Sequence, residues 1–333
     1  MNRWKRQVNV TLLALSVMAT ATGWWALGTG STTLAKIIIT AHGVSGIALL
    51  VLFPAKSRIA KWGLRSAGRS RKVIGFALAA LVLSTVAGGL LHAVGGWRTY
   101  LGLLPMQWHV GAATAAGVLL IGHVLIHHRI RWRRWRPLLR RTDLDRRAAL
   151  GAAGIAAGAA ALWLLAPGRA RRETGSHEIG SGDPRRVPVT QWLFDPVPSI
   201  DADRWRLRAA GRELDLAALA GRPQRTVRAV LDCTGGWYTE QEWRGVPLTE
   251  LGLPPGRSID VVSATGYRRR FPASEAAVLL LATHAAGDPL SAGHGGPARL
   301  VAPGRRGFWW VKWVTGIDVV DAPAWRQPPF PLS

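Results

Sequence analysis

Five long apolar runs dominate the first half of this 333-residue chain and constrain its fold more than any other feature. A transmembrane helix needs about 20 consecutive apolar residues, so each run is long enough to cross a bilayer. The sequence therefore predicts an N-terminal α-helical membrane bundle of about five transmembrane helices. The runs cover Val8–Leu27, Leu34–Phe53, Val73–Val94, Trp108–Ile126 and Ala148–Ala166.

The segments between these runs alternate between basic and nearly uncharged. The start MNRWKR is basic, GTGSTT is uncharged, and PAKSRIAKWGLRSAGRSRK carries seven Lys and Arg. GGWRTYLGLLPM carries one, and HHRIRWRRWRPLLRR is again strongly basic. Basic loops stay on the cytoplasmic side, so we predict a multi-pass protein of the plasma membrane with its C-terminal part on the extracytoplasmic side. The net charge of +24 is then mostly a topology signal, and nucleic acid is not predicted as a partner.

The fifth apolar run differs from the others. In RRTDLDRRAALGAAGIAAGAAALWLLAPGRA, paired arginines precede a mildly apolar helix rich in Ala and Gly. This arrangement resembles a twin-arginine export signal embedded in the chain. An ordinary helix with basic flanks explains the same residues, and both interpretations stay open.

Histidines lie within the predicted spans, where ionisable residues are costly and indicate function. With the topology above, His42, His92 and His109 lie at similar depth on three different helices. That placement fits axial ligation of a haem b iron between helices, and hydrogen bonding to a neighbouring helix is the alternative. No inner histidine pairs with His123, so one haem is favoured over two. Residues 1–130 are thus predicted as a four-helix transmembrane segment that resembles bacterial b-type cytochrome membrane subunits.

The middle of the chain, residues 131–187, reads as a basic loop, the fifth helix and a polar linker that contains His177 as a solvated residue. Short β-type runs separated by turns follow, such as TVRAVLDC, SIDVVSATG and WWVKWV. We predict an α+β, β-rich domain over residues 188–333. A helix is expected over Ala273–Ala286, with His284 on its surface.

The chain has a single cysteine, Cys233, in the stretch LDCTGGWYTEQEWRGVPL. One cysteine excludes an internal disulfide. Three interpretations remain open from the residue alone: a small buried apolar residue, a nucleophile, or a soft thiolate ligand for a metal.

Several motifs of the C-terminal part follow one another without large gaps: AVLDCTGGW, WRGVPLTELG, VSATGYRRRFP and GHGGPARLVAPGRRGFWWVKW. In order and spacing they resemble the molybdopterin-binding domain of the sulfite oxidase family, over Pro188–Asp321. The resemblance implies that Cys233 supplies the one protein thiolate to molybdenum. A soft thiolate suits this metal, and the cofactor's dithiolene supplies the other sulfurs.

The resemblance also implies roles for other residues. Arginine offers phosphate a bidentate fork and lysine a point charge, which suits binding of the cofactor's pterin and phosphate. The expected cofactor-binding residues are Cys233, Thr234, Gly235, Trp237, His294, Arg299 and Lys312, with Trp243 as a second wall of the site.

Tyr267 and Arg268 are the expected catalytic residues beside Cys233. The run Arg268–Arg270 would border the pocket and favour an anionic oxo substrate. A solvated strand end is the alternative interpretation of these arginines.

Two features depart from the family pattern. No domain is expected after Ser333, where sulfite oxidases carry an immunoglobulin-like dimerisation module, and no soluble haem module is expected.

The layout looks closer to the bacterial periplasmic branch, which includes sulfoxide reductases. We therefore expect a membrane-anchored oxidoreductase that transfers an oxygen atom to or from a small oxo substrate. Electrons would be exchanged through haem b with a quinone or an electron-transfer protein, in either direction. The alternatives are a membrane segment that only anchors, and a non-catalytic domain that binds a cofactor or a partner.

Overall fold

The computed structural model describes residues 3–65, 68–127, 146–165, 171–191 and 196–330. The chain divides into two compact units, one that ends at Gly175 and one that begins at Ser176, with the short stretch Gly28–Ser31 counted with the second.

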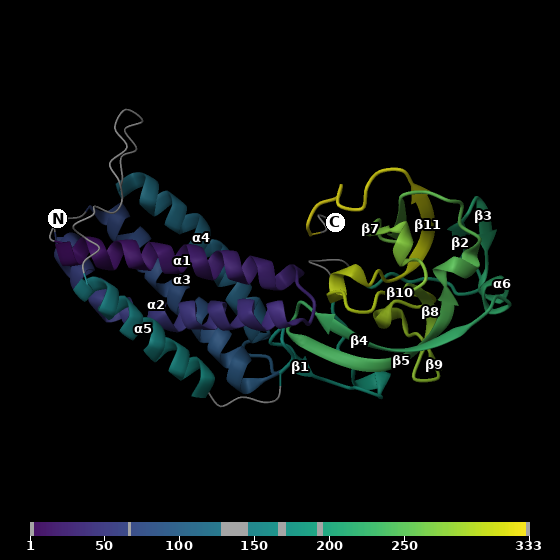
Figure 1. The fold of residues 1–333 in the computed structure, drawn as a ribbon, viewed down its shortest axis with the longest axis horizontal. Helices are drawn as coiled ribbons and strands as arrows, with labels where there is room; N and C mark the ends of the chain where they lie inside the picture. Colours follow the sequence, from purple (N-terminus) through teal and green to yellow (C-terminus); the bar gives the residue numbers. More distant parts are fainter. Residues whose placement is uncertain (1–2, 66–67, 128–145, 166–170, 192–195, 331–333) are drawn as a thin grey trace. The chain divides into compact units, whose positions relative to one another are not determined.

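The N-terminal unit is helical throughout its described secondary structure (Figure 1). The helices are α1 (Arg3–Gly28), α2 (Thr33–Arg65), α3 (Arg69–Gly95), α4 (Pro105–His127) and α5 (Arg146–Leu165). Helix α3 packs on α4 and α2 on α5. Small residues allow this close packing. At Gly43 of α2, for example, an added Cβ would lie only 2.4 Å from the Trp163 ring of α5.

Four of these helices, α1 to α4, are long and apolar enough to cross a membrane by length and composition. The apolar part of α5, Ala149–Leu165, is shorter, so the prediction of a fifth span is not confirmed. Large apolar side chains such as Trp24, Ile37 and Phe76 are exposed on the helices. His128 and the paired arginines Arg140 and Arg141 lie outside the described residues.

The C-terminal unit contains two sheets (Figure 1). The six-stranded sheet has the order β1-β5-β8-β10, with β4 paired to β5 and β9 to β8; the five-stranded sheet has the order β3-β2-β11-β6-β7. One short helix, α6 (Leu216–Ala220), follows β3. The strands are β1 (His177–Glu178), β2 (Leu207–Ala209), β3 (Arg212–Leu214), β4 (Arg225–Cys233), β5 (Trp237–Pro247), β6 (Ser258–Ser263), β7 (Arg268–Pro272), β8 (Leu280–Ala285), β9 (Asp288–Pro289), β10 (Arg299–Val301) and β11 (Val314–Val320).

The longest hairpin, β4–β5, carries the single cysteine at its turn. The two strands pair antiparallel from Arg225 opposite Gly245 to Cys233 opposite Trp237. The turn between them needs the left-handed conformation of Gly236, whose φ is +89°. The end of this hairpin therefore holds Cys233 and Trp237 side by side on neighbouring strands.

Three local predictions are wrong. The expected helix over Ala273–Ala286 is a 3₁₀ turn, Ala273–Glu275, followed by strand β8. Most of WWVKWV is not a strand, because β11 begins only at Val314. His177 is not a solvated linker residue: it is 3% exposed in β1, where it pairs parallel with Trp237 of β5.

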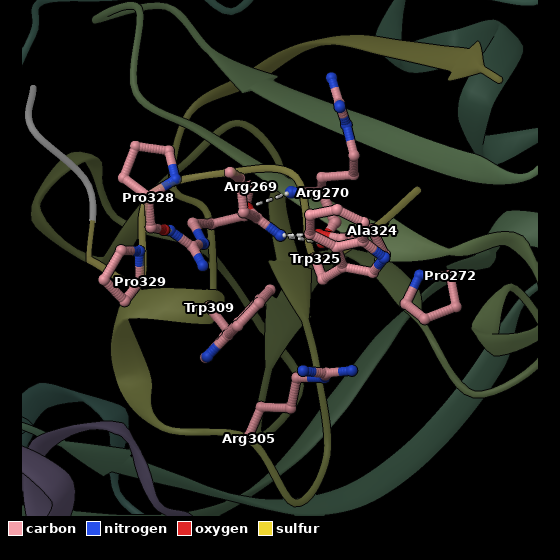
Figure 2. A pocket seen from close by; sticks show the side chains of 10 residues that line it. Arg269, Arg270, Pro272, Arg305, Trp309, Ala324, Trp325, Pro328 and Pro329 are labelled. Atoms are coloured by element: carbon pink, nitrogen blue, oxygen red, sulfur yellow. Dashed lines mark hydrogen bonds between the residues drawn. The ribbon is translucent and has the colours of Figure 1, made fainter. Parts of the chain in front are cut away.

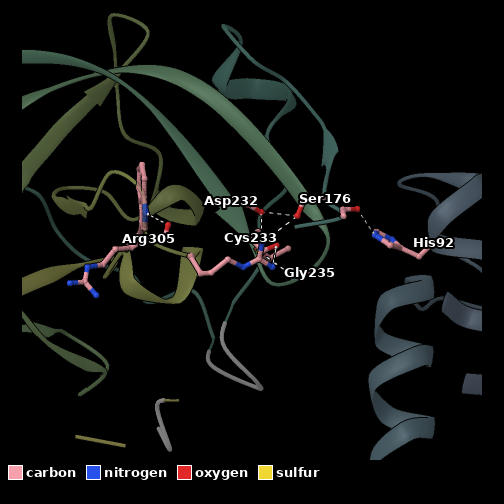
Figure 3. A network of polar contacts seen from close by, with 10 residues as sticks. His92, Ser176, Asp232, Cys233, Gly235 and Arg305 are labelled. Atoms are coloured by element: carbon pink, nitrogen blue, oxygen red, sulfur yellow. Dashed lines mark hydrogen bonds and ion pairs between the residues drawn. The ribbon is translucent and has the colours of Figure 1, made fainter. Parts of the chain in front are cut away.

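A buried ion pair lies directly beneath the cysteine. Asp232 and Arg306 are each 4% exposed, and Arg306 Nη1 lies 2.5 Å from Asp232 Oδ1. The Ser176 hydroxyl donates to the same carboxylate oxygen at 2.7 Å, and Figure 3 shows Ser176 and Asp232 next to Cys233. Arg306 Nη2 also donates to the carbonyl oxygen of Cys233 at 3.2 Å. One guanidinium thus fixes both the end of β4 and the backbone of Cys233.

Replacing Asp232 with asparagine should destabilise the C-terminal unit strongly, because it leaves the Arg306 charge buried without its partner. Removing one partner of a buried pair costs about 3–5 kcal/mol. Denaturant unfolding of the detergent-purified protein measures the loss, and the double variant Asp232→Leu/Arg306→Met should recover much of it. Arg228→Met is the matched control, since Arg228 and Glu240 form an exposed pair worth less than about 1 kcal/mol. An equal effect of Asp232→Asn and Arg228→Met would contradict the prediction.

Candidate functional site

A pocket with a cavity volume of about 90 Å³ lies at the end of the β4–β5 hairpin and is partly open to solvent. Its walls come from segments far apart in the sequence, between Pro188 and Trp313. The structure brings together here seven residues that the sequence singled out, namely Cys233, Thr234, Trp237, Tyr267, His294, Arg299 and Lys312.

The sulfur of Cys233 lies in this pocket and is held by local contacts. The backbone N–H of Gly235 donates to Sγ at 3.3 Å, and the two residues lie together in Figure 3. The Thr190 hydroxyl lies 3.5 Å from the same sulfur. Cys233 is half-buried and bonded to no other cysteine. A cysteine sulfur that opens on a pocket can serve as a soft metal ligand.

Arg299 forms a cationic wall of the pocket and is completely buried at the start of β10. Its Nη1 donates to the His294 carbonyl at 3.0 Å, and its guanidinium lies 5.1 Å from the centroid of the Trp243 ring. Among the described residues, its Nε has no acceptor. Burial lowers the pKa of Arg299 to about 10, and the nearby Cys233 raises it. A buried cation with a donor to spare is a site for an anion.

Lys312 adds a second cation. Its Nζ donates to the carbonyl oxygens of Gly293 at 2.6 Å and Thr190 at 2.9 Å, and lies 3.3 Å from Gln191 Oε1. The pKa of Lys312 is lowered to about 7, mainly by burial and also by the charge of Arg299, while Cys233 opposes the shift. The two cations thus disfavour each other unless an anion lies between them.

His294 closes the same side of the pocket. Its Nε2 donates to the Val187 carbonyl at 3.0 Å, so Nδ1 is left to accept from the Ser291 hydroxyl at 2.8 Å. Burial lowers the pKa of His294, an effect that the Val187 hydrogen bond opposes and that Arg299 and Lys312 increase. The neighbouring Gly295, with φ +100°, lets the loop turn where a Cβ would lie 3.0 Å from Lys312 Cγ. The structure therefore places a neutral imidazole beside two cations.

Other predicted residues lie differently. Tyr267 lines the pocket, but its hydroxyl donates to the Phe308 carbonyl. Trp243 is buried behind the pocket, stacked edge-on against Trp310 at 5.5 Å, and does not line it. The arginine run is not brought to this pocket: Arg268 is exposed on β7, and Arg269 and Arg270 line another pocket.

Sequence reasoning missed three contributors. Thr190 and Gln191 sit at the pocket although they belong to a stretch that follows a polar linker, and nothing in their local pattern marks them. Arg306 holds the Cys233 backbone from within the stretch PGRRG, where Arg305 precedes it. An arginine in such a loop carries no sequence signal that distinguishes a buried ion pair from an exposed charge.

A separate pair of histidines lies in the helical unit. Nε2 of His42 on α2 and Nε2 of His109 on α4 are 3.4 Å apart, with the rings nearly perpendicular. The Nδ1 atoms donate away from the pair, His42 to the Ala19 carbonyl at 2.9 Å and His109 to the Thr85 carbonyl at 2.7 Å. If both rings are neutral, the two Nε2 lone pairs face each other.

Small residues make room for these rings. A Cβ at Gly23 would lie 2.9 Å from His42 Cε1, and a Cβ at Gly89 would lie 3.0 Å from His109 Nδ1. His92 is not brought to the pair, because its Nε2 donates to the Gly175 carbonyl at 3.2 Å. In the described parts of the chain no three His, Cys, Asp or Glu side chains form a metal-binding group.

Comparison with known proteins finds similarity in the C-terminal unit. Residues 194–327 match the oxidoreductase molybdopterin binding domain. Mitochondrial sulfite oxidase of Rattus norvegicus is 28% identical over an alignment of 166 residues that covers 37% of this chain and 30% of the relative. The Drosophila melanogaster enzyme is 25% identical over 174 residues, covering 40% and 30%.

The chain thus spans about a third of the length of these curated relatives. A solved structure, the sulfane dehydrogenase SoxCD from Paracoccus pantotrophus, is 28% identical over 38% of this chain and 40% of its own, with a TM-score of 0.35. The C-terminal unit thus contains a region similar to the molybdopterin-binding oxidoreductase domain of sulfite oxidases, and Cys233 lies within that region.

Proposed function

We propose that this chain is a membrane-anchored, molybdenum-dependent oxidoreductase with its catalytic domain on the extracytoplasmic side. It would comprise a four-helix transmembrane segment over residues 1–130, a connecting region over 131–187 and the catalytic domain over 188–333. The observation that carries the proposal is the convergence of Cys233 with Arg299, Lys312 and His294 on one pocket.

The residues present fit a molybdopterin cofactor. The cofactor carries a phosphate, and Arg299 offers it a buried guanidinium whose Nε lacks an acceptor among the described residues. Lys312 adds a point charge, and its lowered pKa is the behaviour of a desolvated cation that an anion would relieve. Cys233 would supply a single thiolate to the metal, as a soft donor to a site whose other sulfurs come from the pterin.

When bound, the molybdopterin group supplies two-electron redox chemistry with transfer of an oxygen atom. The protein's part is to bind, orient and exclude water. Trp237 and Trp310 form apolar walls, and Thr234 and Tyr267 add polar groups beside Cys233. The Tyr267 hydroxyl donates to the Phe308 carbonyl, and it would have to leave that carbonyl before it could donate to a small oxo substrate. Arg268 is not proposed as a catalytic residue, because it is exposed and does not line the pocket.

The histidine pair supports the second half of the proposal, exchange of electrons through a haem b in the helical unit with quinone or an electron-transfer protein. Two imidazoles from different helices face each other through Nε2, and each Nδ1 donates to a backbone carbonyl. That second hydrogen bond would fix the tautomer of each ring and leave its Nε2 able to bind a haem iron. His42 and His109 are therefore the proposed ligands, and His92 is not.

Cys233→Ser should abolish turnover while pterin content stays near that of the wild type. Arg299→Met should lower molybdenum and pterin content together, because it removes the buried cation that faces the phosphate. Protein made in a host competent for molybdenum insertion is assayed for both contents, for reduction of a sulfoxide by reduced viologen and for sulfite oxidation by ferricyanide. Arg228→Met, an exposed arginine on β4, is the control. Absence of molybdenum from the wild type would refute the enzymatic proposal.

His42→Ala and His109→Ala should each remove iron and the haem absorbance of the purified protein, because haem in this arrangement needs both axial ligands. His92→Ala and His123→Ala are the matched controls and should keep both signals. Molybdenum content should be unchanged in all four variants, since the cofactor pocket lies in the other unit. Wild-type protein with molybdenum but no iron would leave the helices as an anchor only.

A further inference from the structure

A second pocket of the C-terminal unit is lined by three arginines, has a cavity volume of about 320 Å³ and is partly open to solvent (Figure 2). It lies next to the cofactor pocket along the chain, since Phe308 lines one and Trp309 the other. Its cations are Arg269, Arg270 and Arg305, and prolines and tryptophans form the apolar part of its wall.

Two of the three cations are already paired. Arg270 donates hydrogen bonds to both carboxylate oxygens of Asp260, from Nε to Oδ1 at 2.6 Å and from Nη2 to Oδ2 at 2.7 Å. Arg305 forms a two-pronged contact with Glu275, one prong of which is Nε to Oε2 at 3.1 Å. These carboxylates neutralise Arg270 and Arg305, so neither needs a further anion.

Arg269 is the exception. It is 2% exposed and forms no ion pair with any acidic residue in the described part of the chain. Its Nη1 donates to the Pro328 carbonyl at 3.1 Å, and no described residue accepts from Nε. Burial lowers the pKa of Arg269 to about 10, Tyr267 raises it and Arg305 lowers it, so the side chain stays charged at neutral pH. A buried charge without a counter-charge is costly.

Aromatic contacts stabilise this cation only in part. Arg269 lies 4.0 Å and Arg305 4.4 Å from the centroid of the Trp309 ring, and Figure 2 shows them on either side of it. Stacking engages the face of a guanidinium and leaves its N–H groups, which lie in the plane, free to donate. A ligand that carries one negatively charged acceptor group would therefore compensate the charge of Arg269.

The remaining wall indicates what carries that charge. Trp325 is 80% exposed at the pocket, and Pro328 and Pro329 flank Arg269 in Figure 2. The Trp325 side chain, left in solvent beside the prolines, offers a flat apolar surface next to Arg269 that a ligand with an apolar body could cover. An inorganic ion would use the arginine and leave this surface bare.

We propose that this pocket binds a small organic monoanion, a carboxylate on a flat apolar body, with the carboxylate on Arg269 and the body against Trp325 and the prolines. The site is separate from the cofactor pocket and does not depend on molybdenum. Benzoate is the simplest probe of this chemistry, and benzamide has nearly the same shape without the charge.

The test is calorimetric titration of the detergent-purified full chain. Benzoate should bind the wild type saturably, and benzamide and inorganic phosphate should not. Arg269→Met should weaken benzoate binding at least about tenfold, because a charge-assisted hydrogen bond is lost. Trp325→Ala, an exposed position that leaves the fold intact, should weaken it about threefold or more. Arg228→Met is the matched control and should bind like the wild type.

Cys233→Ser separates this proposal from the proposed function, because it disables the molybdenum ligand and should keep benzoate binding unchanged. Loss of benzoate binding in Cys233→Ser would place the ligand in the cofactor pocket and overturn the proposal. Equal binding of benzamide, wild-type affinity in Arg269→Met, or no benzoate binding at all would overturn it as well. If Arg269→Met does not fold, the proposal is tested by the affinity of Trp325→Ala for benzoate and by the comparison of benzoate with benzamide in the wild type.

Discussion

The C-terminal unit is organised around the buried pair of Asp232 and Arg306. Taking two charges out of water is expensive, so the pair persists only because a hydroxyl and a backbone carbonyl complete its hydrogen bonds. Arg306 comes from the loop before η6 (Gly307–Trp309), whereas Asp232 comes from the end of β4. The pair therefore ties two distant segments together directly under Cys233, and the position of the sulfur depends on it.

Both pockets show how this chain places arginines inside protein. Arg299 lies against Trp243 and Trp310, and Arg269 lies against Trp309. A guanidinium is flat and weakly hydrated. Covering it with an aromatic ring therefore costs less desolvation free energy than covering an ammonium group. The high tryptophan content, 17 residues in all, thus contributes to sites as well as to the helices. In each pocket the ring stabilises the cation and leaves an N–H donor for an anion.

Much of the site could be predicted from sequence because its parts are carried by compact motifs. Cys233 ends an alternating strand, and His294, Arg299 and Lys312 lie within one short stretch. The helix expected over Ala273–Ala286 failed because Leu280 and Leu281 are fully buried in β8 between two other strands, where burial overrides the helix preference of alanine and leucine. Buried His177 could not be foreseen, since its strand is two residues long and depends on a partner 60 residues away.

The cofactor pocket draws its walls from Pro188 to Trp313, which is nearly the whole C-terminal unit. No contiguous fragment contains both Cys233 and Lys312 without the strands between them. Such non-local contacts form late, after the entropy of closing long loops has been overcome. A cofactor that recognises this pocket therefore binds only the folded unit. By mass action, bound cofactor would raise the free energy of unfolding of the loaded protein above that of the empty protein. The supply of cofactor would therefore determine how long each molecule stays folded.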